Sequence, residues 1–164
     1  MKHQTFNLIE NRTKRWVLLF ITALVLSGIT AFDPAFFLRP LLSYVPSSTD
    51  STSLGYWLYY VNEGLMQSSS KYPFLLYGYD WLAFAHIMIG ILFLGVYSDP
   101  VKNIWVVKFG IICCIAIIPF AIICGSIRQI PFIWRLIDCS FGLIGLLPLL
   151  IIRKNILLLQ QLKK

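Results

Sequence analysis

The sequence predicts an all-α membrane protein, a four-transmembrane-helix bundle with an interfacial amphipathic segment between helices one and two. Of 164 residues, 58% are hydrophobic and 13% are charged, which is about half the charge of an ordinary soluble domain. Four long apolar runs each approach the length that crosses about 30 Å of hydrocarbon as a helix. Because a bilayer offers the backbone no hydrogen-bond partners, such runs cross it as helices.

We expect one integral membrane domain over residues 1–164. Its spanning helices are expected at about 16–32, 77–96, 105–124 and 132–152, with an outer loop at 33–76 and a tail at 153–164. The first run follows a basic lead, as in a signal peptide. It is longer than a signal-peptide core, however, and no A-x-A-like cleavage site follows it, which favours a retained helix.

The outer loop opens with Asp33-Pro34, which is typical of a helix stop. Apolar residues then recur at helical spacing in the segment 54–65, LGYWLYYVNEGL: Leu54, Trp57, Leu58, Val61 and Leu65. Thr52 or Ser53 can cap this helix. Its Trp and Tyr content favours a position flat on the outer interface. It is either a lid without a ligand or a lid over a polar site between the helices.

The two remaining connections, 98–103 and 125–131, are short and predict helical hairpins. In the second, Gly125 suits a helix C-terminus and Pro131 suits a helix start. The tail after Arg153 is rich in leucine and basic residues, and we expect it to rest on the inner surface.

The basic residues predict the orientation of the chain. Ten of the fourteen Lys and Arg residues fall in zones that share one side of a four-pass protein: Lys2, Arg12, Lys14, Arg15, Lys102, Lys108, Arg153, Lys154, Lys163 and Lys164. The positive-inside rule therefore places both termini in the cytoplasm, for a protein of the cytoplasmic membrane. The net charge of +7 is an orientation signal. It does not indicate nucleic-acid binding, because no basic face carries interleaved aromatic residues.

Two charged residues stand at the head of the fourth apolar run. Arg135 and Asp138 are three apart and share one helix face. Side chains lean toward the N-terminus of their helix, so Arg135 leans toward the outer water. Asp138 lies about one turn deeper, where an unpaired charge is costly. We therefore expect it to hold Arg135, on a stripe with Gly142 and Gly145 that faces the bundle and suits close helix packing.

The second helix contributes Asp80 and His86. Asp80 is either an N-cap, which a carboxylate favours, or a functional carboxylate. His86 is either a neutral histidine bonded to a neighbouring helix or a group that handles protons or a ligand. The outer third of the bundle thus collects charged residues that either close it as an ion-pair network or form a site, namely Asp33, Asp80, Arg128, Arg135 and Asp138. The candidate polar site comprises Asp80, His86, Arg128, Arg135 and Asp138.

The four cysteines do not indicate a disulfide, a metal or a cofactor. Cys113, Cys114, Cys124 and Cys139 form no C-x-x-C pair and differ in depth, so we interpret them as apolar filler. Lipoprotein signal peptidases are similar in outline, with four passes and two outer aspartates, but their Asn- and Gly-rich motifs are missing here. An external C-x-x-C for a disulfide oxidoreductase and a second intramembrane histidine for a haem protein are also missing. A sortase-like enzyme could use Cys139, Arg135 and His86, but their spacing is not diagnostic. The residues favour a non-catalytic protein.

Three segments carry a resemblance: YGYDWLAFAHI (77–87), SDPVKNIWVVKFG (98–110) and IRQIPFIWRLIDCSFGLIGLLPL (127–149). They resemble motifs of a family of uncharacterised bacterial four-helix integral membrane proteins, over residues 77–152. The resemblance implies a bacterial inner-membrane protein and no particular activity.

We therefore expect an accessory or scaffold subunit of the lipid bilayer that binds a membrane-protein partner or an anionic lipid headgroup at its outer face. Arg128 and Arg135 would meet the anionic group, and Asp80 would complete the cluster. The alternative is an intramembrane hydrolase or a proton-coupled carrier that uses Asp80, His86 and Asp138.

Overall fold

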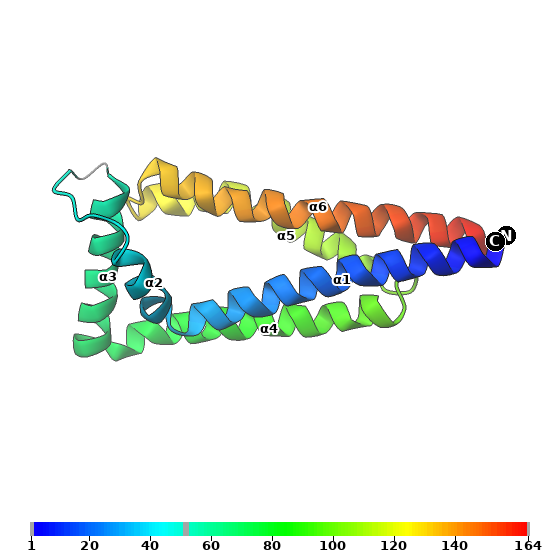
Figure 1. The fold of residues 1–164 in the computed structure, drawn as a ribbon, viewed down its shortest axis with the longest axis horizontal. Coiled ribbons are helices and arrows are strands. Elements are labelled where there is room, and N and C mark those ends of the chain that lie inside the picture. Colours follow the sequence, from blue (N-terminus) through cyan, green and yellow to red (C-terminus); the bar gives the residue numbers. More distant parts are fainter. Residues whose placement is uncertain (1, 51–52, 164) are drawn as a thin grey trace. The chain divides into compact units, whose positions relative to one another are not determined.

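The computed structural model describes residues 2–50 and 53–163, and these residues contain six α-helices, one 3₁₀ helix and no strand (Figure 1). Four helical segments are long and apolar enough to cross a membrane: Lys2–Phe32, Pro73–Ser98, Ile104–Ile127 and Phe132–Lys163. The predicted all-α class, a four-transmembrane-helix bundle with an amphipathic segment between its first two helices, is confirmed in its elements. The expected first, second, third and fourth spans correspond to α1, α4, α5 and α6.

The chain divides into two compact units. Unit 1 combines Met1–Ala23 with Ile89–Lys164, and unit 2 is Leu24–Met88. Helices α1 (Lys2–Phe32) and α4 (Tyr77–Ser98) each contribute one part to either unit.

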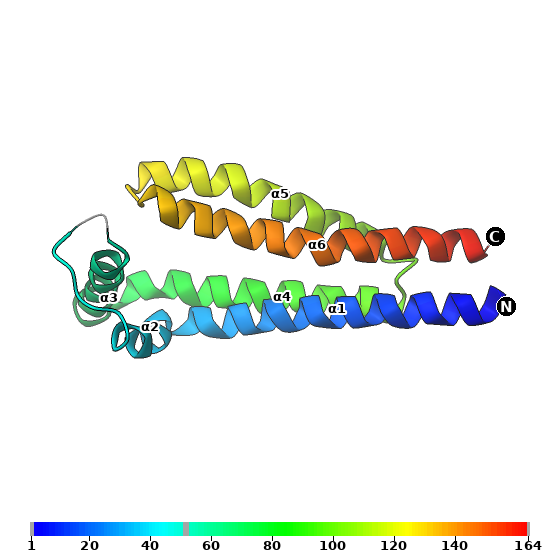
Figure 2. The same ribbon diagram turned by 45° about the horizontal axis from the view of Figure 1, so that its top comes forward.

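Unit 1 is built on a helical hairpin of α5 (Ile104–Ile127) and α6 (Phe132–Lys163), which run antiparallel (Figures 1 and 2). Its large apolar side chains with at most 1% exposure are Val17, Phe93, Val96, Val106, Val107, Leu149, Ile152, Ile156 and Leu159. The rings of Phe20 and Phe93 lie 4.7 Å apart at their centroids. The N- and C-terminal ends of the chain lie at one end of unit 1, and the α5–α6 turn lies at the other (Figures 1 and 2).

The predicted glycine stripe packs α6 against α5. A methyl group added to Gly142 would lie 2.5 Å from the carbonyl oxygen of Cys114, and one added to Gly145 would lie 3.1 Å from the Cys114 sulfur. The thiol of Cys139 points at the carbonyl oxygen of Ile118, 3.8 Å away. The expected close packing at these small residues is confirmed, because a side chain at position 142 would force the two backbones apart.

Two helices extend beyond the expected limits in unit 1. Helix α1 begins at Lys2 instead of near residue 16, and α6 continues to Lys163 instead of ending near residue 152. The tail is therefore not a separate segment. It continues the helix because Ile152, Ile156 and Leu159, which are 0–1% exposed, keep the apolar stripe at helical spacing.

Unit 2 contains a helix that the sequence analysis missed. Helix α2 (Pro34–Leu42) starts directly after α1 ends at Phe32. The backbone N–H of Phe36 donates to Asp33 Oδ1 at 3.0 Å. Asp33-Pro34 thus ends one helix, as predicted, and also starts the next, with Asp33 as N-cap and Pro34 in the first turn.

The predicted amphipathic helix is α3 (Leu54–Lys71), which runs six residues past the expected segment. Ser53 caps it by accepting from the Tyr56 N–H at 3.1 Å, and Thr52 lies outside the described residues. Leu58 and Leu65 are buried as α3 packs on α2 and on the 3₁₀ helix η1 (Pro73–Leu76). The Tyr59 hydroxyl donates to the Leu42 carbonyl at 3.1 Å.

Candidate functional site

The α5–α6 turn closes with backbone hydrogen bonds. The Ile130 N–H donates to the Gly125 carbonyl at 2.9 Å, and the Gln129 N–H donates to the Ser126 carbonyl at 3.1 Å. This is a Schellman motif, in which the residue after the C-cap adopts a left-handed conformation. Gln129 does so with φ of 56°, in a position that usually favours glycine. The turn therefore satisfies the hydrogen-bonding groups of its own backbone at the closed end of the hairpin.

Arg135 folds its side chain back across the end of α5. Its Cγ and Cδ lie 2.6 and 2.5 Å from the place of an added Gly125 Cβ. Its Nη1 donates to the Ser126 hydroxyl, which donates in turn to the Ile122 carbonyl at 2.7 Å. Its guanidinium carbon is 5.4 Å from the centroid of Phe132, which is three residues nearer the N-terminus of α6. The predicted lean toward that N-terminus is confirmed.

The expected bond between Arg135 and Asp138 is not formed. Within residues 2–50 and 53–163 the ion pairs are Lys14–Glu10 at 2.7 Å and Lys102–Asp99 at 3.6 Å. Arg135 reaches toward the turn, while Asp138 stands one helical turn further along α6 and is half-buried. The Arg135 side chain occupies the space left by the missing side chain of Gly125, here called the glycine notch, and donates to the Ser126 hydroxyl. Both contacts direct the guanidinium away from the Asp138 carboxylate. The expectation that Asp138 holds Arg135 was therefore wrong.

Two cationic groups at this turn keep unused donors. Arg135 Nε is buried without a hydrogen-bond partner among the described residues. Arg128 is the C-cap of α5 and is exposed, and no hydrogen bond or ion pair of its side chain occurs within the described chain. The adjacent N-terminus of α6 adds the positive end of a helix dipole. We name Arg128, Arg135, Ser126 and Gly125 the arginine turn.

Asp80 occupies a different environment, in unit 2. Helix α4 starts at Tyr77 after η1, so Asp80 is the fourth residue of the helix and not its N-cap. It still lies in the first turn, where the helix dipole favours a carboxylate. Asp80 lines a shallow depression of about 310 Å³ whose other walls are Phe32, Tyr77, Trp81 and Phe84.

His86 forms a hydrogen bond within its own helix. One interpretation expected a bond to a neighbouring helix instead. Its Nδ1 lies 2.8 Å from the Leu82 carbonyl oxygen. Since that oxygen only accepts, geometry assigns the proton to Nδ1. Its Cβ lies 3.2 Å from the place that a Gly28 methyl group would take, so α1 and α4 approach closely here. Asp80 and His86 share no hydrogen bond among the described residues.

The five predicted site residues thus fall into two sets. Arg128, Arg135 and Asp138 belong to unit 1, and Asp80 and His86 belong to unit 2; their action as one cluster stays a prediction. Gly125 was expected at a helix C-terminus, but α5 continues to Ile127 with Arg128 as its C-cap. The contacts of Gly125 and Ser126 with Arg135 were not predicted. Residues at similar distances from a hairpin turn lie at one level, which could have paired Ser126 with Arg135, nine positions away.

No group of three or more His, Cys, Asp or Glu side chains in residues 2–50 and 53–163 could hold a metal ion. All four cysteines are free. No family model, curated protein or solved structure matches this chain. The resemblance of residues 77–152 to uncharacterised four-helix membrane proteins stays a prediction.

Proposed function

We propose that this chain is a non-catalytic membrane subunit that holds an anionic lipid headgroup at the arginine turn. The observation that carries the proposal is the buried, unpartnered Nε of Arg135, in the same arginine turn as the exposed Arg128. A buried donor without a partner costs about 1–3 kcal/mol, and that cost is relieved when an acceptor arrives. The site therefore favours a ligand that brings acceptor oxygens.

A phosphate group fits these donors. Guanidinium groups offer several N–H donors in a fixed plane and bind phosphate oxygens with charge-assisted hydrogen bonds. Arg135 Nη1 already donates a hydrogen bond to the Ser126 hydroxyl, so the guanidinium is oriented before the ligand binds. The turn joins the ends of two spanning segments, Ile104–Ile127 and Phe132–Lys163. Lipid phosphates lie at that level of a bilayer.

The proposal includes a placement for the chain. The positive-inside rule puts both termini in the cytoplasm and the arginine turn outside, in the cytoplasmic membrane of a bacterium. Amphipathic α3 would then lie on the outer interface. Reporter fusions at Lys2 and Lys163, scored for cytoplasmic or external activity, test this placement independently of lipid binding.

The binding test is native mass spectrometry of the full chain, extracted gently and titrated with phosphatidylglycerol. Arg128→Gln removes one guanidinium without disturbing packing, because Arg128 is exposed. We expect retention of phosphatidylglycerol to weaken about tenfold, the effect of losing one charge-assisted hydrogen bond. The matched control is Arg12→Gln, which removes an exposed arginine from the opposite end of unit 1.

Two further variants sharpen the test. Arg135→Lys keeps the charge but loses the planar fork, so retention should fall while the fold persists. Asp138→Asn should leave retention unchanged, because Asp138 forms no ion pair with Arg135 in the described chain. Equal retention by the wild type, Arg128→Gln and Arg12→Gln would refute lipid binding at this turn. A co-purifying protein that is lost from Arg128→Gln would identify a protein partner instead.

A further inference from the structure

We infer that the depression around Asp80 is a second lipid site, which binds the primary ammonium group of a zwitterionic phospholipid such as phosphatidylethanolamine. This inference rests on unit 2 alone and does not depend on the proposed function of the arginine turn. The sites are tested separately by substitutions in different units, Asp80→Asn in unit 2 and Arg128→Gln in unit 1.

The walls of the depression are aromatic. Trp81 forms edge-to-face contacts with two other rings of the depression. Its ring centroid lies 6.0 Å from that of Tyr77, with 80° between the planes, and 5.9 Å from that of Phe84, with 87° between the planes. Phe32 of α1 closes the group. Edge-to-face rings present their electron-rich faces in different directions around one space. A cation is attracted to an open ring face, most strongly to that of a Trp.

Asp80 supplies the charge that selects a cation. It is the charged residue of the depression, and its side chain is exposed. Within the described residues its carboxylate takes part in no ion pair and no side-chain hydrogen bond. A carboxylate accepts hydrogen bonds, and a primary ammonium group donates three. A quaternary ammonium group donates none, so the carboxylate favours ethanolamine over choline.

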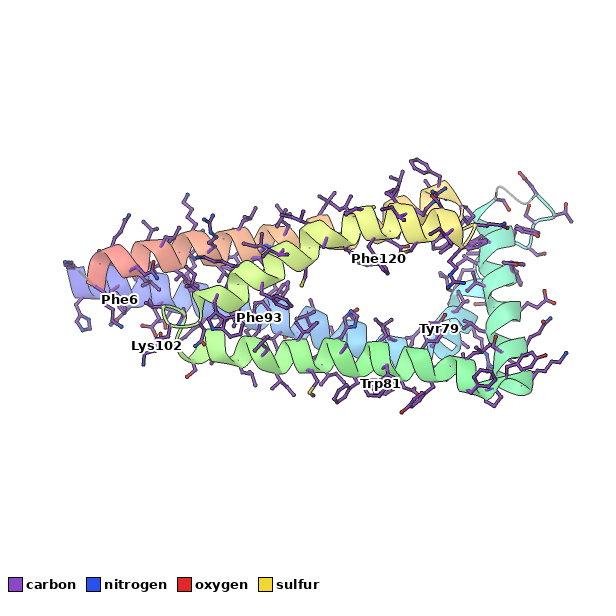
Figure 3. All side chains as sticks on the ribbon, turned by 180° about the vertical axis from the view of Figure 1, so that it is seen from behind. Phe6, Tyr79, Trp81, Phe93, Lys102 and Phe120 are labelled. Carbon is purple, nitrogen blue, oxygen red and sulfur yellow. The ribbon has the colours of Figure 1, made fainter. Side chains whose placement is uncertain are left out.

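The position of the depression indicates the source of the ammonium group. Asp80 lies near the start of the spanning segment Pro73–Ser98, and Phe32 ends the segment Lys2–Phe32. Both therefore lie at the level of the headgroups. Trp81, labelled in Figure 3, is 57% exposed, and Phe32 and Phe84 are 51% and 49% exposed. These rings are open to an acyl chain beside the headgroup, which a soluble amine lacks.

The experiment compares two lipids on the full chain in detergent micelles, by native mass spectrometry with stepwise addition of phosphatidylethanolamine or phosphatidylcholine. We expect the wild type to retain phosphatidylethanolamine at least threefold more strongly than phosphatidylcholine. Asp80→Asn should weaken retention of phosphatidylethanolamine about tenfold and remove the preference. Trp81→Leu should weaken retention of both lipids about threefold, because it removes the largest ring face.

Glu63→Gln is the matched control, since it removes an exposed carboxylate from α3, outside the depression. Circular dichroism of each variant checks that helix content is unchanged. Equal retention of the two lipids by the wild type would overturn the inference. So would Asp80→Asn retaining phosphatidylethanolamine as well as Glu63→Gln does. Free ethanolamine that competes as well as the lipid, mole for mole, would also overturn it, because the source would then be a soluble amine.

Discussion

The two turns of unit 1 satisfy the backbone hydrogen-bonding groups between their helices in different ways. In the α4–α5 turn, side chains complete the backbone: Asp99 Oδ1 accepts from the Lys102 N–H at 3.0 Å, and Asn103 Nδ2 donates to the carbonyl oxygens of Gly95 and Asp99 at 2.8 and 3.0 Å. In the α5–α6 turn the backbone completes itself through the Schellman motif. Its arginine side chains are left with donors to spare.

The difference separates a structural turn from a turn with binding capacity. Where a side chain is consumed by the backbone, its loss should lower stability and leave ligand binding unchanged. Where a charged side chain keeps unused donors, its loss should change binding first. Two measurements test this contrast: the free energy of unfolding, obtained by titration with sodium dodecyl sulfate, and the retention of phosphatidylglycerol.

The largest effect is expected at Gly125. Gly125→Ala places a methyl group 2.5 Å from Arg135 Cδ, so the arginine must leave its notch. Overpacking of this kind costs about 1–3 kcal/mol, and we expect about 2 kcal/mol together with weaker lipid retention. The control is Gly64→Ala, because an added methyl group there meets nothing within 4 Å; it should gain about 0.5–1 kcal/mol. Equal effects at the two glycines would refute the notch.

Asn103→Ala tests the structural turn. The variant loses two part-buried hydrogen bonds to backbone carbonyls. Both carbonyls keep a backbone partner, so we expect a loss of about 1–2 kcal/mol. Retention of phosphatidylglycerol should not change. If retention fell as it does in Arg128→Gln, the proposed contrast between the two turns would be wrong.

Gln129→Gly should stabilise the chain. Gln129 holds a φ of 56°, which costs a residue with a side chain about 1 kcal/mol relative to glycine. The unfolding free energy should rise by slightly less, because glycine loses more entropy on folding. Gln161→Gly, inside α6, is the control and should destabilise. A loss at both positions would contradict the Schellman geometry.

The smallest effect is a pH dependence at Asp99. The Lys102 backbone N–H, and to a lesser degree the Lys102 charge, hold the pKa of the Asp99 carboxyl below its ordinary value, against a smaller opposing effect of burial. A lowered folded-state pKa stabilises the chain above the ordinary value of about 4 and loses that contribution as pH falls through the folded-state pKa. Unfolding midpoints at about pH 6 and about pH 3 should therefore differ more in wild type than in Asp99→Asn.

Hydrophobic run length predicted the four spans, because the requirement to cross the hydrocarbon fixes both length and composition. The ends of the helices were less predictable. The sequence analysis took Asp33-Pro34 as a stop, yet the same two residues also begin α2. Past residue 152 the charges of Arg153 and Lys154 suggested a change of environment. The buried stripe of Ile156 and Leu159 continued the helix instead.

The arginine turn was half predictable. The depth and lean of Arg135 follow from rules about helices that the sequence already contains. Its partner did not follow, because spacing along one helix favours Asp138, three residues away. The hydroxyl of Ser126 comes from the opposite helix, and its position depends on the register of the hairpin. The spacing of Gly142 and Gly145 along one helix predicted a close approach of helices, but it did not predict the register between α5 and α6.

Helix α6 does not end where its apolar run ends. From Lys154 to Lys163 it continues for ten residues, which adds about 15 Å of rigid spacer. A group fused rigidly to that end would be held at a fixed distance from the headgroups and at a fixed angle around the helix axis. Each residue inserted there in helical form would rotate the attached group by about 100° around the axis of α6. The length of the insertion would therefore set the direction in which a rigidly fused group points.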